Sequence, residues 1–68
     1  MPNYVVNDKV QNNGDHEVHT TNCVYYPLIK NSTSLGWHSN CQSAVKEAKN
    51  HYSQSNGCAT CSSECHTS

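Results

Sequence analysis

Four side chains that can bind a metal ion lie close together near the end of the chain, at Cys58, Cys61, Cys65 and His66. Cys58 and Cys61 have the C-x-x-C spacing, which lets two thiolates bind one ion from a single tight turn. A tetrahedral zinc site needs four ligands, so a second pair is required. A metal centre is therefore the feature that most limits how this chain can fold.

The best candidates for the second pair are His19 and Cys23. These residues bracket a short polar loop, 20–22, that can wrap around an ion. A site built from the tail alone is less favourable, because its closely spaced ligands crowd the backbone and leave the first half of the chain unattached. We therefore expect one Zn²⁺ ion bound by His19, Cys23, Cys58 and Cys61. Two residues remain possible substitutes for the fourth ligand: Cys65 and His66.

The chain is poor in apolar residues, which makes a metal ion more important for folding. Only 34% of its 68 residues are hydrophobic, so residues 1–68 are expected to form one domain with a thin core. A structural zinc ion contributes roughly 10–16 kcal/mol of apparent folding free energy. That is comparable to the whole stability of a small domain.

Two features of the sequence bear on the cellular compartment. The first residues lack a basic region followed by a long apolar run, and no stretch approaches the length of a membrane span. We therefore expect a cytoplasmic protein with reduced thiols, in which clustered cysteines bind metal. The odd count of five cysteines argues against a fully paired disulfide framework, which remains the alternative. Cys41 is expected to be a small buried apolar residue.

The first part of the chain is predicted to form two paired strands. Residues 3–7 are rich in β-branched and aromatic side chains, and residues 16–20 alternate between polar and apolar. The segment 11–15 between them contains Asn13-Gly14, which is typical of a turn. Along the second strand, side chains point alternately to opposite faces.

This alternation separates the two histidines of the second strand. His16 and Val18 share one face of the strand, and Glu17 and His19 share the other. His16 and His19 therefore cannot bind the same ion without a kink. We expect His16 to be a solvated surface histidine beside Asp15.

One helix is predicted, at about residues 40–53. Ser39 and Gln42 have the spacing of a capping box, and Asn56-Gly57 is a stop signal. Small and apolar residues recur on one stripe: Cys41, Ala44, Val45, Ala48 and Tyr52. The helix is expected to lead directly into the Cys58–Cys61 turn.

The segments between the second strand and the helix are less regular. The apolar run 24–29 contains Pro27, which excludes a central strand, so we expect an irregular segment that covers the core. Residues 30–34 are expected to be an exposed loop and 35–38 a brief strand. The predicted fold class is α+β: short strands and a hairpin with one main helix, held together by zinc.

The arrangement of these residues resembles a known family. His19-x3-Cys23, the extended segment at Leu35-Gly36-Trp37, a helix carrying alanines, and Gly57-Cys58-x2-Cys61 are similar to the zinc-binding domain at the N-terminus of the bacterial Ada DNA-repair protein. The match spans about residues 18–61. In that family the first cysteine of the first pair is the zinc-bound thiolate that accepts a methyl group from a DNA phosphotriester.

Three departures change what the resemblance implies. His19 stands at the methyl-acceptor position, and a neutral imidazole cannot replace a thiolate nucleophile. The proline that precedes the second cysteine pair in the family is absent, and Cys65-His66 has no counterpart. The resemblance therefore implies a related zinc-bound scaffold without DNA methyl transfer.

Charge limits the partners. The formal charge is −1, with no arginine and four scattered lysines, so the basic patch of a nucleic-acid-binding protein is missing. We expect a monomeric structural zinc module, acting through protein–protein or weak nucleic-acid contacts, with no enzymatic activity and no membrane association. Three alternatives remain. One is an enzyme that uses a thiolate such as Cys65, and another is a metal-handling or redox protein, suggested by five cysteines and five histidines in 68 residues. The third, which follows from the resemblance alone, is an Ada-like relative that transfers alkyl groups from DNA.

Overall fold

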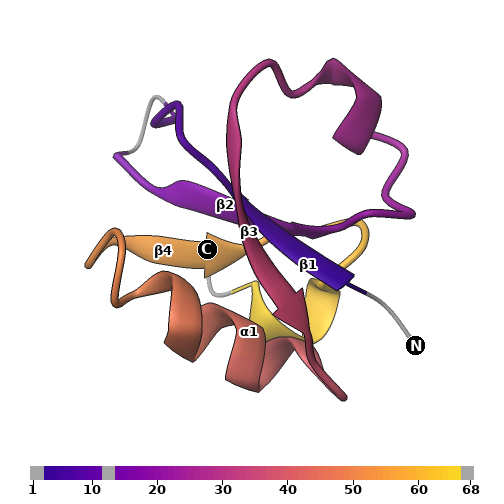
Figure 1. Ribbon diagram of the computed structural model, residues 1–68, viewed down its shortest axis with the longest axis vertical. Coiled ribbons are helices and arrows are strands. Elements are labelled where there is room, and N and C mark those ends of the chain that lie inside the picture. The colour runs from indigo at the N-terminus through magenta and orange to yellow at the C-terminus, as the bar shows by residue number, and fades with distance from the viewer. Residues whose placement is uncertain (1–2, 12–13, 67–68) are drawn as a thin grey trace.

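The computed structural model describes residues 3–11 and 14–66, in which a four-stranded sheet packs against one helix (Figure 1). The strands, in chain order, are β1 (Asn3–Asn7), β2 (His16–Thr20), β3 (Ser32–Trp37) and β4 (Ser55–Gly57). Their order in the sheet is β3-β1-β2-β4; β1 is antiparallel to both β2 and β3, whereas β2 and β4 are parallel. The predicted strands at 3–7 and 16–20, their pairing and the α+β class are confirmed.

The register of β1 and β2 determines which of their side chains face the helix and which face the opposite side of the sheet. Tyr4, Val6 and Val18 pack into the hydrophobic cluster formed with the helix. Val5 pairs with His19, so these two side chains point to the opposite face. Both are buried, with 5% and 2% of their surface exposed. The predicted alternation along β2 therefore places His19 on the side of the sheet away from the main core.

The helix α1 (Cys41–Ala48) is shorter than the predicted 40–53 and begins with a different cap. The side chain of Asn40 accepts a hydrogen bond from the Ser43 amide at 3.0 Å, so the predicted Ser39–Gln42 capping box is wrong. The backbone after Ala48 tightens, with the Asn50 amide bonded to the carbonyl three residues earlier. The predicted apolar stripe is confirmed in part, since Cys41, Ala44 and Ala48 are buried.

The strand β4 was not predicted. The sequence pattern predicts that Asn56-Gly57 ends the helix and leads directly into the cysteine turn, but these residues pair with β2 in parallel. Gly57 lies against the following segment so closely that a Cβ atom there would stand 2.7 Å from the Cβ of Cys65. The strand thus fixes where the chain enters the C-x-x-C turn.

The apolar run 24–29 contributes no fully buried residue, contrary to the expectation that it covers the core. It contains a short 3-10 helix, η1 (Tyr26–Leu28), and most of its side chains are exposed, with Val24 68% and Leu28 75% exposed, while Tyr26 and Ile29 are half-buried. The predicted loop 30–34 is wrong in its second half, because β3 begins at Ser32 and continues through the expected strand. Pairing with β1 overrides the weak strand preference of the serines there.

A disulfide joins Cys41 at the start of α1 to Cys65 in a second 3-10 helix, η2 (Ser63–Cys65). The expectation that all cysteines are reduced is therefore wrong for this pair. Cys41 is buried in the core, as predicted, but it is disulfide-bonded. The bond attaches the tail to the helix across a sequence separation of 24 residues. The other three cysteines are free.

Candidate metal centre

Two separate parts of the chain bring the predicted ligands together. His19 comes from β2, and a turn closed by the Cys23 amide bonding the Thr20 carbonyl at 3.0 Å brings Cys23 back beside it. Cys58 directly follows β4, where its amide bonds the Val18 carbonyl at 2.9 Å. Cys61 follows on the C-x-x-C turn. The sheet pairing of β2 with β4 is therefore what places the two ligand pairs side by side.

The distances within this group suit a tetrahedral ion. One donor atom from each of the four residues lies within 4.8 Å of the other three. The sulfurs of Cys23 and Cys58 are 3.9 Å apart, and the Cys61 sulfur is 3.7 Å from Nδ1 of His19. In a zinc tetrahedron with bonds of about 2.3 Å to sulfur and 2.0 Å to nitrogen, the edges are about 3.5–3.8 Å. The donors need to move little to surround one ion.

The group is well shielded from water. His19 and Cys58 are each 2% exposed, Cys23 is 5% exposed, and Cys61 is half-buried. Among residues 3–11 and 14–66, no other group of three or more histidine, cysteine or acidic side chains is arranged to hold a metal ion.

Backbone amides are aimed at two of the sulfurs. The Thr20 amide lies 3.4 Å from the Cys61 sulfur, and the Thr60 amide lies 3.4 Å from the Cys58 sulfur. Such donors favour the negatively charged thiolate over the thiol. Thr20 is the last residue of β2 and Thr60 lies in the C-x-x-C turn. Each of the two segments that form the site therefore donates an amide that stabilises a thiolate charge.

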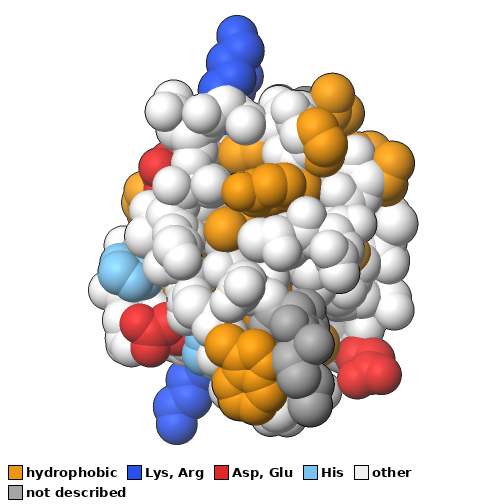
Figure 2. Space-filling model, turned by 45° about the vertical axis from the view of Figure 1, so that its right-hand side comes forward, with side chains coloured by type: hydrophobic (Ala, Val, Ile, Leu, Met, Phe, Trp, Pro, Cys, Tyr) orange, Lys and Arg blue, Asp and Glu red, His pale blue; other side chains and the backbone are white. Residues whose placement is uncertain are grey.

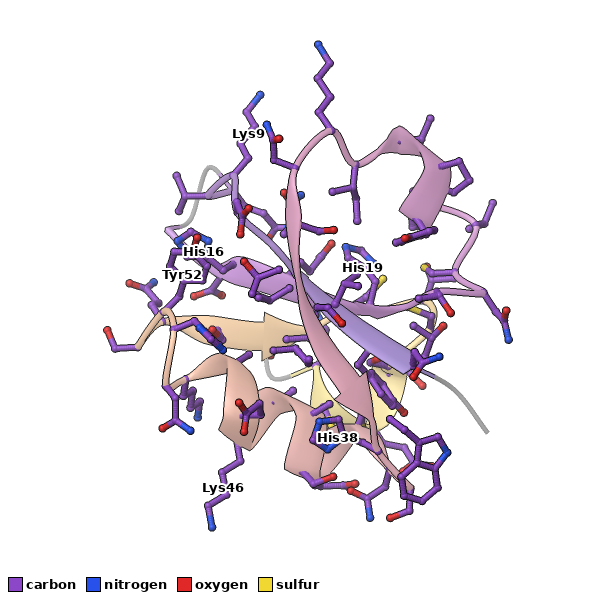
Figure 3. The ribbon with its side chains drawn as sticks, viewed as in Figure 1. Lys9, His16, His19, His38, Lys46 and Tyr52 are labelled. Carbon is purple, nitrogen blue, oxygen red and sulfur yellow. A yellow bond between two sulfur atoms is a disulfide. The ribbon has the colours of Figure 1, made fainter. Side chains whose placement is uncertain are left out.

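A carboxylate orients the histidine. Nε2 of His19 lies 3.2 Å from Oε1 of Glu17, two residues earlier on the same face of β2. A proton on Nε2, donated to Glu17, leaves the lone pair of Nδ1 directed at the sulfurs. Histidines that bind metals in proteins have this type of carboxylate partner. Figure 3 shows His19 with sulfur atoms beside it. Glu17 was not predicted as part of the site, although the strand alternation had placed it on the His19 face.

Burial acts on the ionisation of the group. It lowers the pKa of His19, against a smaller opposing effect of Glu17, and it raises the pKa of the Cys61 thiol. A neutral imidazole is the form that binds metal, so the first effect favours binding. The second effect opposes ionisation of Cys61 until a cation is present to compensate the thiolate charge.

The two substitute ligands lie elsewhere. The sulfur of Cys65 is bonded to Cys41, so this possible substitute ligand has no free thiol to offer a metal. Nδ1 of His66 lies 3.1 Å from the Gly57 carbonyl, outside the group of four. Both residues instead attach the tail to β4 and α1.

His16 is also placed differently from the prediction. Its ring stacks on Tyr52, with centroids 3.8 Å apart and planes within 7°, and Nδ1 lies 2.9 Å from the Asn7 carbonyl. It is therefore a packing residue that links β1 and β2 to the segment after α1, rather than a solvated group beside Asp15. Its separation from His19 in the site agrees with the strand alternation.

No family model, curated protein or solved structure matches this chain. The resemblance to the Ada zinc-binding domain therefore consists of the ligand spacing and the neighbouring segments alone. The interpretation of the site depends on its own geometry.

Proposed function

We propose that this chain is a small structural zinc module in which His19, Cys23, Cys58 and Cys61 bind one Zn²⁺ ion. The observation that carries the proposal is the convergence of four donors, three buried and Cys61 half-buried, within 4.8 Å of one another, from segments about forty residues apart. Without a cation, that arrangement packs three thiols and an imidazole together at the expense of apolar contacts.

The donor set favours zinc over other common cations. Thiolate and imidazole ligands suit zinc, whereas calcium and magnesium prefer oxygen ligands. Three cysteines and one histidine complete a four-coordinate site, which is the pattern of structural rather than catalytic zinc. The ion would join the turn 20–23, which follows β2, to the C-x-x-C turn, which follows β4. It would thereby hold the paired strands β2 and β4 together.

The same ligand set argues against Ada-like methyl transfer. The acceptor position of that family is occupied here by His19, whose neutral imidazole is a ligand without thiolate reactivity. The module is instead proposed to act as a monomer through contacts of its folded surface with another protein. A cytoplasmic location remains a prediction. The Cys41–Cys65 disulfide weighs against it, because disulfides persist mainly in oxidising compartments. Cell fractionation tests the location.

Metal analysis of ligand variants tests the proposal. Native mass spectrometry of the purified chain should give one zinc per chain, and Co²⁺ substitution should give the intense absorption of tetrahedral thiolate coordination. Cys58→Ser and His19→Ala should each lose the ion, whereas His66→Ala and His51→Ala, matched histidine controls outside the group, should keep it. A chain that binds no metal, or that keeps full occupancy in both ligand variants, would rule out this site.

A further inference from the structure

The end of β1 and the loop before β3 enclose a groove of about 410 Å³. It is lined by Asn7, Asp8, Lys9, Leu28, Ile29, Lys30 and Asn31, and is called here the Lys9–Lys30 groove. Its two walls are held together by a hydrogen bond from the Asp8 amide to the Asn31 carbonyl, 3.1 Å long. The groove is therefore part of the folded sheet rather than a gap between loose segments.

One side of the groove is apolar and open to solvent. Leu28 is 75% exposed, and Val24 and Tyr25 on the same loop are 68% and 47% exposed. Figure 2 shows hydrophobic side chains gathered in the upper half of one face, beneath a protruding lysine. The chain has few apolar residues, so exposing these side chains gives up hydrophobic stabilisation of the core. Exposed apolar clusters of this kind mark binding surfaces.

The charge of the groove has the opposite sign to that of the chain. Lys9 and Lys30 make no ion pair with the residues that the structure describes. The Asp8 carboxylate is held by two hydroxyl donors, Thr33 at 2.7 Å and Tyr52 at 2.9 Å. Two lysines and one aspartate give the groove a formal charge of +1, against −1 for the whole chain. Its electrostatic complement is an acidic ligand.

We propose that the Lys9–Lys30 groove binds a short peptide segment of another protein, in which one large apolar side chain is flanked by acidic residues. The apolar side chain packs on Leu28 and Ile29, and the carboxylates pair with Lys9 and Lys30. The exposed side-chain amide of Asn31 is available to the peptide backbone. An anionic membrane is a poorer occupant, because only two lysines attract it and the negative charge of the whole chain opposes adsorption.

This surface is separate from the zinc ligands, so zinc-loaded protein can be used throughout and zinc retention reports that each variant is folded. A random peptide library displayed on phage is selected against the wild-type chain. The enriched peptides should contain a leucine, isoleucine or aromatic residue with acidic residues within two positions on either side. Amide chemical shifts should move at Lys9, Leu28, Ile29 and Lys30 when a synthetic copy of an enriched peptide is added.

The variants identify the charges involved. Lys9→Glu and Lys30→Glu should each weaken peptide binding about tenfold or more, and binding should weaken further as salt is raised. Lys46→Glu on α1 is the matched control, because Lys9 and Lys46 lie at opposite ends of the molecule (Figure 3), and it should change affinity less than about twofold. Leu28→Ser should also abolish binding while leaving the zinc content intact.

The proposal would be overturned by a selection that enriches no common sequence, by enriched peptides without acidic residues, or by equal loss of binding in Lys9→Glu and Lys46→Glu. Sedimentation with phosphatidylserine vesicles forms a second arm. Adsorption to these vesicles that depends on Lys9 and Lys30, in the absence of peptide binding, would assign the surface to a membrane and reject a peptide partner.

Discussion

At the scale of single residues, the carboxylate of Glu17 should tune the metal centre without touching the ion. It lies 3.2 Å from Nε2 of His19, and accepting a proton from Nε2 would leave the Nδ1 lone pair free to face the sulfurs. Glu17→Gln should weaken zinc binding about 10–100-fold with the ion count unchanged, because such partners raise the basicity of the ligand. Competition with a chromophoric chelator measures this affinity.

The control for Glu17→Gln is Glu47→Gln, which removes a comparable carboxylate 3.7 Å from the exposed His51. That variant should bind zinc as the wild type does. Equal affinities for the two variants would show that Glu17 has no influence on the site.

The same histidine gives the site an acid limit. Burial lowers the pKa of His19 from its ordinary value near 6.5, so below that value the unfolded chain binds a proton that the folded chain excludes. Folded stability and zinc affinity are therefore present above pH 6.5 and should fall as the pH is lowered through and below it, with the thiolates adding to the loss.

A titration of zinc-loaded protein from pH 8 to pH 5, followed by circular dichroism and released zinc, measures the acid limit. Zinc release and loss of structure should coincide, and His66→Ala should behave as the wild type does. Full zinc retention at pH 5 would contradict the assignment of His19 as a ligand.

At the scale of secondary-structure elements, the disulfide and the metal centre hold different parts of the tail. Cys65 attaches η2 to α1, while Cys58 and Cys61 face the β2 turn. Replacing Cys41 and Cys65 together by serine should lower the free energy of unfolding by about 2–4 kcal/mol, as expected for a loop of this size. Because neither residue is a ligand, the variant should still bind one zinc ion.

Urea denaturation of the zinc-loaded variant and wild type gives the stability difference, and mass spectrometry gives the zinc count. An unchanged zinc count with reduced stability is the expected outcome. Complete loss of zinc in the serine variant would mean that Cys41 or Cys65 belongs to the ligand set.

Close packing in the same region predicts a strong effect at one glycine. A Cβ atom at Gly57 would meet Cys65 at 2.7 Å and the Ser62 carbonyl at 2.8 Å, both of them atoms with little freedom to move. Gly57→Ala should therefore destabilise the domain by about 1–3 kcal/mol and weaken zinc binding, because the strand that carries Cys58 must shift.

Gly36→Ala serves as the comparison for thermal and urea unfolding. Nothing lies within 4 Å of its Cβ position, so only its φ of +78° opposes the substitution, and zinc affinity should be unaffected. A Gly57→Ala variant as tolerant as a surface substitution would show that β4 and η2 are not in contact.

The elements also show what the sequence could and could not predict. The strands 3–7 and 16–20 carry their own signal in β-branched residues, and the two ligand pairs carry theirs in spacing. The strand β4 has no such signal, since Ser-Asn-Gly is typical of turns and becomes a strand only by pairing with β2. The Cys41–Cys65 disulfide also has no local sequence signal, because it depends on how the tail folds back onto α1.

At the scale of the whole molecule, we expect a small core and the proposed metal centre to stabilise the fold together. The largest fully buried side chains among the described residues are Val6, Val18 and Cys58, one of which is a proposed zinc ligand. No helix in the described part of the chain is long and apolar enough to cross a membrane. The β2–β4 pair is joined by only three residue pairs, so we expect the proposed ion to be needed to hold the turn 20–23 and the 58–61 turn together.

Chelation is the most direct test of this account. Zinc-loaded protein with its disulfide intact is treated with excess chelator, and amide resonances of β2, β4 and the 58–61 turn are followed by NMR. The account predicts that their dispersion collapses when zinc is removed and returns when one equivalent is added back. A chain that keeps its native spectrum after complete removal of metal would contradict it.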